Sequence, residues 1–172
     1  MNRIKEVIDA ISGQDPIKLR ELAGFFGDDA TINQDVDEIQ LGIITYCFHK
    51  IFLKIHLKEK RGSLVERTLV HLLEGEYSTI IEDIEEFDAE HGLFEGNLVG
   101  KARIKLGSRL HSRGISIPRS AAIVGVKMSD LMDYVGETKE YSHHHRHEGG
   151  MKLEDRLNIA RDLFKPPPSD GL

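Results

Sequence analysis

The side chains best suited to chemistry form a basic block in the second half of the chain. Residues 101–127 contain seven Lys or Arg and no Asp or Glu, whereas residues 69–100 contain nine Asp or Glu and no Lys or Arg. Clustered Lys and Arg side chains neutralise phosphates, so the basic block is a candidate footprint for nucleic acid although the net charge is −6. Its candidate phosphate ligands are Lys101, Arg103, Lys105, Arg109, Arg113, Arg119 and Lys127. The alternative is that the two blocks are solvated faces of neighbouring helices that pair with each other, which carries little functional information.

A histidine run and a single cysteine are also chemically notable, but neither predicts a catalytic site. The run HHHRH, residues 143–147, lies in a polar segment bounded by glycines, where imidazoles lack the fixed geometry of a metal centre. Adventitious metal affinity, or a charge that varies near neutral pH, is the expected behaviour of this run. Cys47 stands in the most apolar stretch with no activating base nearby in sequence, which favours an inert core thiol. We therefore expect no enzyme activity and no cofactor.

Carboxylates and histidines in the first hundred residues lack the spacing of a metal-binding bundle. Such a bundle needs a Glu and a Glu-x-x-His pair directed inward from several helices. His71 and Glu74 give the reverse order, no second matching pair occurs, and His49 and His56 stand seven apart on one expected helix face. We expect the carboxylates of EDIEEFDAEH, residues 82–91, to be solvated, the histidines to be partly buried, and the chain to hold no metal.

Small and apolar residues over 114–136 have the spacing of a helix-turn-helix. Ala121 is small where a second helix would cross, and Gly125, four residues on, suits the positive φ that such a turn commonly requires. Leu131 and Tyr134 are placed to face back into the same small core. A preceding helix over 101–113 completes a unit of three helices. The flanking punctuation supports these bounds, with a closing glycine, a capping serine, a first-turn proline and a final glycine at Gly114, Ser116, Pro118 and Gly136.

At these positions the sequence resembles the small archaeal and bacterial antitoxin-like proteins with a helix-turn-helix. That family has a basic helix, the letters G-I-S, a helix with paired alanines, the pattern A-G-x-S and a last helix with an apolar run. The matching residues here are Gly114, Ile115, Ser116, Ala121, Ala122, Gly125, Val126, Leu131 and Tyr134. The resemblance covers residues 101–137 and implies an antitoxin-like regulator that binds DNA. The first hundred residues resemble helical archaeal proteins of unassigned function.

The second helix of the motif has an unusual set of residues for reading bases. Its groove-facing side would present Lys127, Met128, Ser129, Met132 and Asp133, and the family usually has a capping Ser where Lys127 stands. An acidic side chain there is repelled by phosphates unless it accepts from a base edge such as the cytosine amino group. We expect the basic block to contact phosphates and Ser129 to contribute modest base reading. Specificity would then come from a homodimer on two half-sites.

The remaining elements predict an all-α chain in three parts. Residues 1–100 are expected to form a helical bundle, with helices over 4–11, 16–26, 36–58, 64–73 and 77–90, and the third of these at its centre. Residues 101–137 form the helix-turn-helix. Residues 138–172 are a His-rich linker and an amphipathic tail helix, MKLEDRLNIARDLF, whose apolar side needs a cover: the protein's own bundle, a second copy or a different protein partner.

Composition is that of a globular cytoplasmic protein. Hydrophobic residues make up 40% and charged residues 30% of the 172, and a lone cysteine gives no sign of an oxidising compartment. The N-terminus has no signal-peptide pattern, and the longest charge-free apolar stretch, IQLGIITYCF, is about half of the ~20 residues that a membrane helix needs. Two functions follow from the sequence: a dimeric transcriptional regulator or antitoxin-like protein that binds duplex DNA, or a helical adaptor for a protein or RNA–protein partner whose helix-turn-helix is structural.

Overall fold

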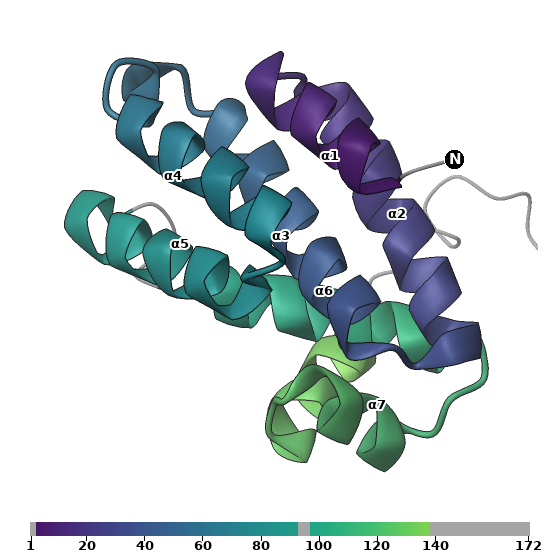
Figure 1. Cartoon of the computed structure of the whole chain (residues 1–172). Helices are drawn as coiled ribbons and strands as arrows, with labels where there is room; N and C mark the ends of the chain where they lie inside the picture. The colour runs from purple at the N-terminus through teal and green to yellow at the C-terminus, as the bar shows by residue number, and fades with distance from the viewer. Residues whose placement is uncertain (1–2, 93–96, 138–172) are drawn as a thin grey trace, which may run out of the picture. The chain divides into compact units, whose positions relative to one another are not determined.

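The computed structural model describes residues 3–92 and 97–137, and within these ranges the chain contains helices and turns but no strand. The expected all-α class is therefore confirmed for this part of the chain (Figure 1). Contacts divide the chain into residues 1–134 and residues 135–172, and only residues 135–137 of the second unit are described. The predicted His-rich linker and tail helix lie outside the described residues. No helix that the structure describes is both long and apolar enough for a membrane span.

Two of the first three helices begin behind a capping aspartate. After α1 (Arg3–Ser12), α2 (Pro16–Asn33) starts behind Asp15, whose Oδ1 accepts from the backbone N–H groups of Ile17 and Lys18 at 2.9 and 3.0 Å. Asp35 caps α3 (Val36–Phe52) in the same way. These aspartates satisfy backbone donors that an α-helix leaves without intrahelical partners. α3 packs against α2, α5 and α6, so the prediction of a central helix is confirmed (Figure 1).

Two predicted helix ends in this region are wrong. The second helix was expected over residues 16–26, but α2 continues to Asn33, and Gly27 lies inside it, where its missing side chain admits Arg109 and Leu106 of α6. The third helix was expected to reach residue 58, but α3 ends at Phe52 and a 3₁₀ turn, η1 (Ile55–Leu57), follows. His56 is therefore not on one helix face with His49. Both differences come from contacts with residues distant in sequence, which a local pattern does not contain.

The acidic stretch over residues 69–100 lies mainly in two helices joined by a short turn. α4 (Gly62–Glu74) and α5 (Tyr77–His91) pack against each other, and α5 buries an apolar stripe of Ile80, Ile81, Ile84 and Phe87. Asp88 corrects the expectation that every carboxylate here is solvated, because it is only 1% exposed and its Oδ2 accepts from the N–H of Leu98 at 2.7 Å. A carboxylate at the start of α6 (Leu98–Ser112) satisfies a free donor and complements the helix dipole.

The last three helices that the structure describes form a trihelical unit, and its first helix, α6, also packs in the bundle. α6 packs against α2, α3 and α5 and also against α7 (Ile117–Val124). Residues 128–137 are helical and follow α7 after a short turn. The helix-turn-helix is thus built directly on a helix whose other sides belong to the bundle.

Candidate nucleic-acid interface and a cationic cleft

Several positions that the sequence pattern expects in the small core of the candidate helix-turn-helix are buried, but Tyr134, also expected there, is only partly buried, and its hydroxyl accepts from Lys105 Nζ. Ala121, Val124 and Leu131 are 3%, 1% and 0% exposed, and Gly125 has a φ of 70° at the C-terminal end of α7. Gly107 of α6 is the residue that the sequence reasoning missed. A Cβ added there would lie 3.1 Å from Val124 Cγ2 and 3.3 Å from Leu131 Cδ1. The two helices of the motif therefore approach α6 closely at Gly107, where a Cβ would fit only if its neighbours moved by a few tenths of an ångström.

The predicted punctuation is confirmed in part. Gly114 has a φ of 103° directly after α6, and α7 carries Pro118 in its first turn. Ser116 occupies the N-cap position, but its side chain makes no capping hydrogen bond. Gly136 was expected to end the last helix, and this was wrong, because residues 136 and 137 are still helical.

Arg103 is bound within the motif itself. Its Nη1 donates to the carbonyl oxygen of Val124 at 2.9 Å, and a Cβ added at Gly125 would lie 3.2 Å from the same nitrogen. A cation at the C-terminus of α7 satisfies a free carbonyl and complements the negative end of the helix dipole. The structure therefore gives Arg103 a role in holding the turn.

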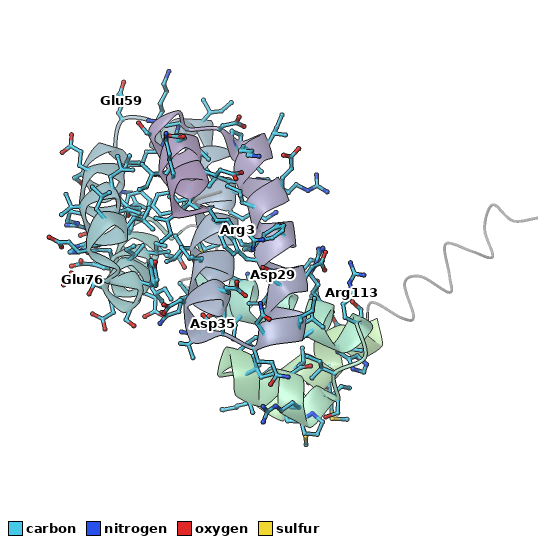
Figure 2. All side chains as sticks on the ribbon, turned by 45° about the vertical axis from the view of Figure 1, so that its right-hand side comes forward. Arg3, Asp29, Asp35, Glu59, Glu76 and Arg113 are labelled. Atoms are coloured by element: carbon cyan, nitrogen blue, oxygen red, sulfur yellow. The ribbon has the colours of Figure 1, made fainter. Side chains whose placement is uncertain are left out.

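Arg109 and Arg113 both bind the carboxylate of Asp28, which connects α6 to α2. Arg109 donates to Asp28 from Nε at 2.9 Å and from Nη2 at 2.8 Å, a bidentate pair, and Arg113 Nε donates to the same carboxylate at 3.1 Å. The Arg109 hydrogen bonds, with the nearby charge of Arg113, hold the pKa of Asp28 below its ordinary value. Arg113 lies beside the lower end of this bundle in Figure 2. These two arginines are partnered by the bundle rather than by the acidic block.

The other predicted contact residues lie on more open surface. Arg119 is exposed and donates to the amide oxygen of Gln34 at 2.6 Å, so no carboxylate neutralises its charge in that contact. Lys101, Lys127 and Ser129 are exposed, and Ser129 Oγ lies 3.0 Å from Asp130 Oδ1. Lys105 instead faces a cleft, with its Nζ donating to Tyr134 Oη at 3.2 Å.

The outward side of the helix over 128–137 is apolar and acidic. Met128 and Met132 are 49% and 50% exposed and stand one turn apart, and Asp130 and Asp133 are exposed beside them. Lys127 is the exposed cation that immediately precedes this helix. The side that would enter a DNA groove thus matches the prediction from sequence in both its composition and its exposure.

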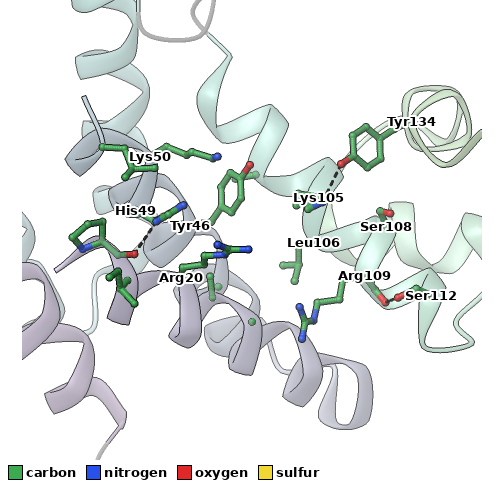
Figure 3. Close-up of a pocket in the computed structure, with 17 residues that line it drawn as sticks. Arg20, Tyr46, His49, Lys50, Lys105, Leu106, Ser108, Arg109, Ser112 and Tyr134 are labelled. Atoms are coloured by element: carbon green, nitrogen blue, oxygen red, sulfur yellow. Dashed lines mark hydrogen bonds between the residues drawn. The ribbon is translucent and has the colours of Figure 1, made fainter. Parts of the chain in front are cut away.

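A cleft of about 920 Å³ opens between α2, α3 and α6 (Figure 3). None of its lining residues is Asp or Glu, although the chain as a whole is acidic. Its basic side chains come from all three helices and are Arg20, His49, Lys50, Lys105 and Arg109. The sequence signal for this cleft was the spacing of four between Tyr46 and Lys50 and between Lys105 and Arg109, which places each pair on one helix face.

Two other groups with potential chemistry are fully accounted for by local contacts. His71 Nδ1 lies 2.8 Å from Glu76 and 3.8 Å from Glu74, around the left-handed Gly75 that ends α4. Sequence spacing did not predict this cluster, because Glu76 joins it only through that turn. Cys47 is completely buried, and burial raises its pKa, so the thiol is protonated and inert as expected.

Replacing Asp28 with Asn is expected to lower the free energy of unfolding at pH 7 by about 1 kcal/mol, a surface-pair magnitude because the carboxylate is partly exposed. The folded-state pKa of Asp28 is depressed, so its ion pairs stabilise the fold above a pH of about 4 and lose that effect as pH falls through the folded-state pKa. Urea unfolding followed by far-UV circular dichroism at pH 7 and pH 3 measures both values. Asp9→Asn, at an exposed position of α1, is the matched control. An equal loss for Asp28→Asn at the two pH values would contradict this linkage.

No protein-family model, curated protein or solved structure shows a significant match to the chain. Function is therefore argued from the residues and their arrangement.

Proposed function

We propose that the protein binds duplex DNA through its helix-turn-helix, as a dimeric transcriptional regulator or antitoxin-like protein. The observation that carries this proposal is the packing of the motif. Val124 and Leu131 close on Gly107, while Lys127, just before the helix over 128–137, and Ser129 within that helix are left exposed. This is the arrangement by which a helix-turn-helix presents its second helix to a major groove.

The contacts within the fold narrow the set of proposed phosphate ligands. Arg103, Arg109 and Arg113 have partners that hold the turn or join α6 to α2, and Lys105 lies in the cleft. The proposed ligands of DNA are the residues on open surface around the motif, namely Lys101, Arg119, Lys127 and Ser129. Arg119 and Lys127 contribute most, because a phosphate contact by a cation supplies sequence-independent affinity.

The exposed helix would read bases through a small number of groups. Asp133 can accept from a cytosine amino group, and the Met128 and Met132 side chains can contact thymine methyl groups. The exposed carboxylates of Asp130 and Asp133 would lie near DNA phosphates and limit the affinity of one copy of the protein for DNA. A dimer on two half-sites compensates for that limit, because both copies contribute contacts.

Fluorescence anisotropy with duplex DNA across a salt series tests the proposal. Replacing Arg119 and Lys127 together with Gln is expected to weaken binding about tenfold or more and to reduce the salt slope by about two, because two phosphate contacts are lost. Lys58→Gln with Lys60→Gln is the control, since it makes the same charge change at exposed positions between η1 and α4. Absence of binding at low salt, or equal weakening by the two double variants, would contradict DNA binding through the motif.

The second candidate function is a helical adaptor that docks a protein on the same helix. The half-exposed Met128 and Met132, with Asp130 and Asp133 beside them, favour it, because exposed apolar anchors one turn apart are typical of helix-mediated docking. Met128→Ser with Met132→Ser distinguishes the two functions. An adaptor would lose its protein partner in this variant and keep it in the Arg119 and Lys127 variant, and it would show no DNA binding at low salt.

A further inference from the structure

The cleft between α2, α3 and α6 gathers more positive charge than its internal contacts neutralise. Arg109 shares the carboxylate of Asp28, but Lys105 donates to the neutral hydroxyl of Tyr134. Lys50 Nζ lies 5.5 Å from the centre of the Tyr46 ring, which is also a neutral partner. Arg20 reaches the same cleft from α2 (Figure 3). Cations gathered in a concave site raise the local concentration of anions.

His49 adds a switchable donor to these fixed charges. Its Nδ1 lies 2.8 Å from the carbonyl oxygen of Pro16, and a carbonyl can only accept, so Nδ1 carries the proton and Nε2 remains for a ligand. Burial holds the pKa of His49 below its ordinary value, and the charges of Lys50 and Arg20 lower it further. An anion beside Nε2 reverses that electrostatic effect and favours the doubly protonated imidazolium.

The walls of the cleft indicate that the ligand has an organic part as well as negative charge. Its floor and sides include small or apolar residues from all three helices, namely Ala23, Gly24, Gly42, Ala102 and Leu106. The ring of Tyr46 stands between His49 and Lys105 in Figure 3, where it can lie against a planar group. A volume of about 920 Å³ is at the upper end of the range for small-molecule sites.

We infer that this cleft binds a phosphorylated small molecule, with Arg20, His49 and Lys50 on one side of the phosphates and Lys105 on the other. Several fixed cations match a ligand of multiple negative charge, and arginine pairs with phosphate through two parallel hydrogen bonds. The site is concave and lies between helices of the bundle, which suits an enclosed small molecule better than a nucleic-acid backbone. This inference does not depend on the proposed DNA binding, because Arg119 and Lys127 do not line the cleft.

Isothermal titration calorimetry of the full chain with ADP at low ionic strength tests the inference. ADP is expected to bind with a submillimolar dissociation constant and more tightly than inorganic pyrophosphate, because only ADP has a base to place against the apolar wall. Citrate, a carboxylate of similar charge, is expected to bind at least tenfold more weakly than ADP. Undetectable ADP binding at 1 mM, or equal affinity for ADP and either of the other two anions, would overturn the inference.

A double variant locates the binding. Arg20→Gln with Lys50→Gln is expected to weaken ADP binding at least tenfold, while the Lys58→Gln and Lys60→Gln control changes it less than twofold. Thermal melting followed by circular dichroism establishes that both variants are folded. We expect the cleft variant to fold because Arg20 is exposed and Lys50 is partly exposed. Equal weakening in both variants would overturn the assignment to the cleft. A parallel loss of duplex DNA affinity in the Arg20 and Lys50 variant would identify a nucleic-acid groove instead and also overturn it.

The pH dependence of the same titration provides an independent readout. The charged and titratable groups around His49 are Arg20 on α2, Tyr46 and Lys50 on α3, and Lys105 and Arg109 on α6. Among these groups, His49 is the one whose charge can change near neutral pH when an anion lies beside Nε2. The terminal phosphate of ADP also titrates near pH 6, so the readout is the difference between two proteins: the wild type is expected to take up more protons on binding ADP near pH 6 than His49→Gln does. Proton uptake that persists unchanged in His49→Gln would contradict the placement of the phosphates beside His49.

Discussion

Replacing Gly107 with valine is expected to lower the free energy of unfolding by about 3 kcal/mol and to separate the helix-turn-helix from the bundle. Even a single added carbon would lie 3.1 Å from Val124 Cγ2 and 3.3 Å from both Leu131 Cδ atoms. Ordinary contacts between carbons are about 3.5–4.0 Å, so the neighbours must already move for a Cβ. The two further carbons of valine extend into side chains that are 1% and 0% exposed and have no open space to enter.

Gly107→Ala separates overpacking from the general effect of removing a helical glycine. Alanine gains up to about 1 kcal/mol of helix propensity, which offsets a displacement of a few tenths of an ångström, so this variant is expected to be near neutral. Gly62→Val is the control for valine, because a Cβ at Gly62 meets no atom within 4 Å. Urea unfolding followed by far-UV circular dichroism measures all three. A Gly107→Val variant as stable as Gly62→Val would show that the motif does not pack on α6 as described.

The features of the helix-turn-helix that are set by neighbouring residues were predictable. Gly114 and Gly125 take positive φ because a turn follows a helix there, and Ala121 is buried because a helix crosses it. Asp15 caps α2 for the same kind of local reason. Each of these depends on a few consecutive residues, whose spacing is visible in the sequence.

The features set by distant residues were not predictable. A glycine can end a helix, but Gly27 and Gly107 stand inside helices at places where side chains of another helix come close. No local sequence pattern distinguishes these two uses of glycine. Asp88 is one of several carboxylates in a row, and its burial follows from the start of α6 ten residues later. The pairing of Asp28 with Arg109 joins residues 81 apart.

Of the two candidate sites, only the one whose residues are close together in sequence was predictable. The exposed residues of the helix-turn-helix were predicted because they share one short segment. The cleft was not, because Arg20, Lys50 and Lys105 come from three helices whose packing alone brings them together. The basic block, which reads as one footprint in the sequence, is distributed by the fold among a turn, an ion-pair cluster, a cleft and an exposed surface.

Replacing Arg61 with methionine is expected to lower the free energy of unfolding by about 3 kcal/mol, because the guanidinium serves as the cap of α3 from nine residues away. Arg61 is 5% exposed. Its Nη1 donates to the carbonyl oxygens of Ile51 and Phe52 at 3.3 and 3.2 Å, and its Nη2 donates to Gln14 Oε1 at 2.6 Å. Methionine retains much of the buried volume but removes the donor to the carbonyl oxygen of Phe52 and to Gln14 Oε1, whereas the carbonyl oxygen of Ile51 keeps the N–H of Lys54 at 3.1 Å.

Arg67→Met is the matched control, because the Arg67 side chain is 50% exposed and pairs with Asp83 at 3.3 Å, so its removal is expected to cost less than removal of the buried Arg61. Equal destabilisation by the two variants in urea unfolding would contradict the capping role of Arg61.

The same substitution is also expected to affect the cleft, because His49 and Lys50 occupy the last turn of α3, which Arg61 caps. Fraying of that turn displaces two of the proposed phosphate ligands, so Arg61→Met is expected to weaken ADP binding although Arg61 does not line the cleft. Unchanged ADP affinity in a destabilised Arg61→Met protein would show that the ligand is held without the end of α3.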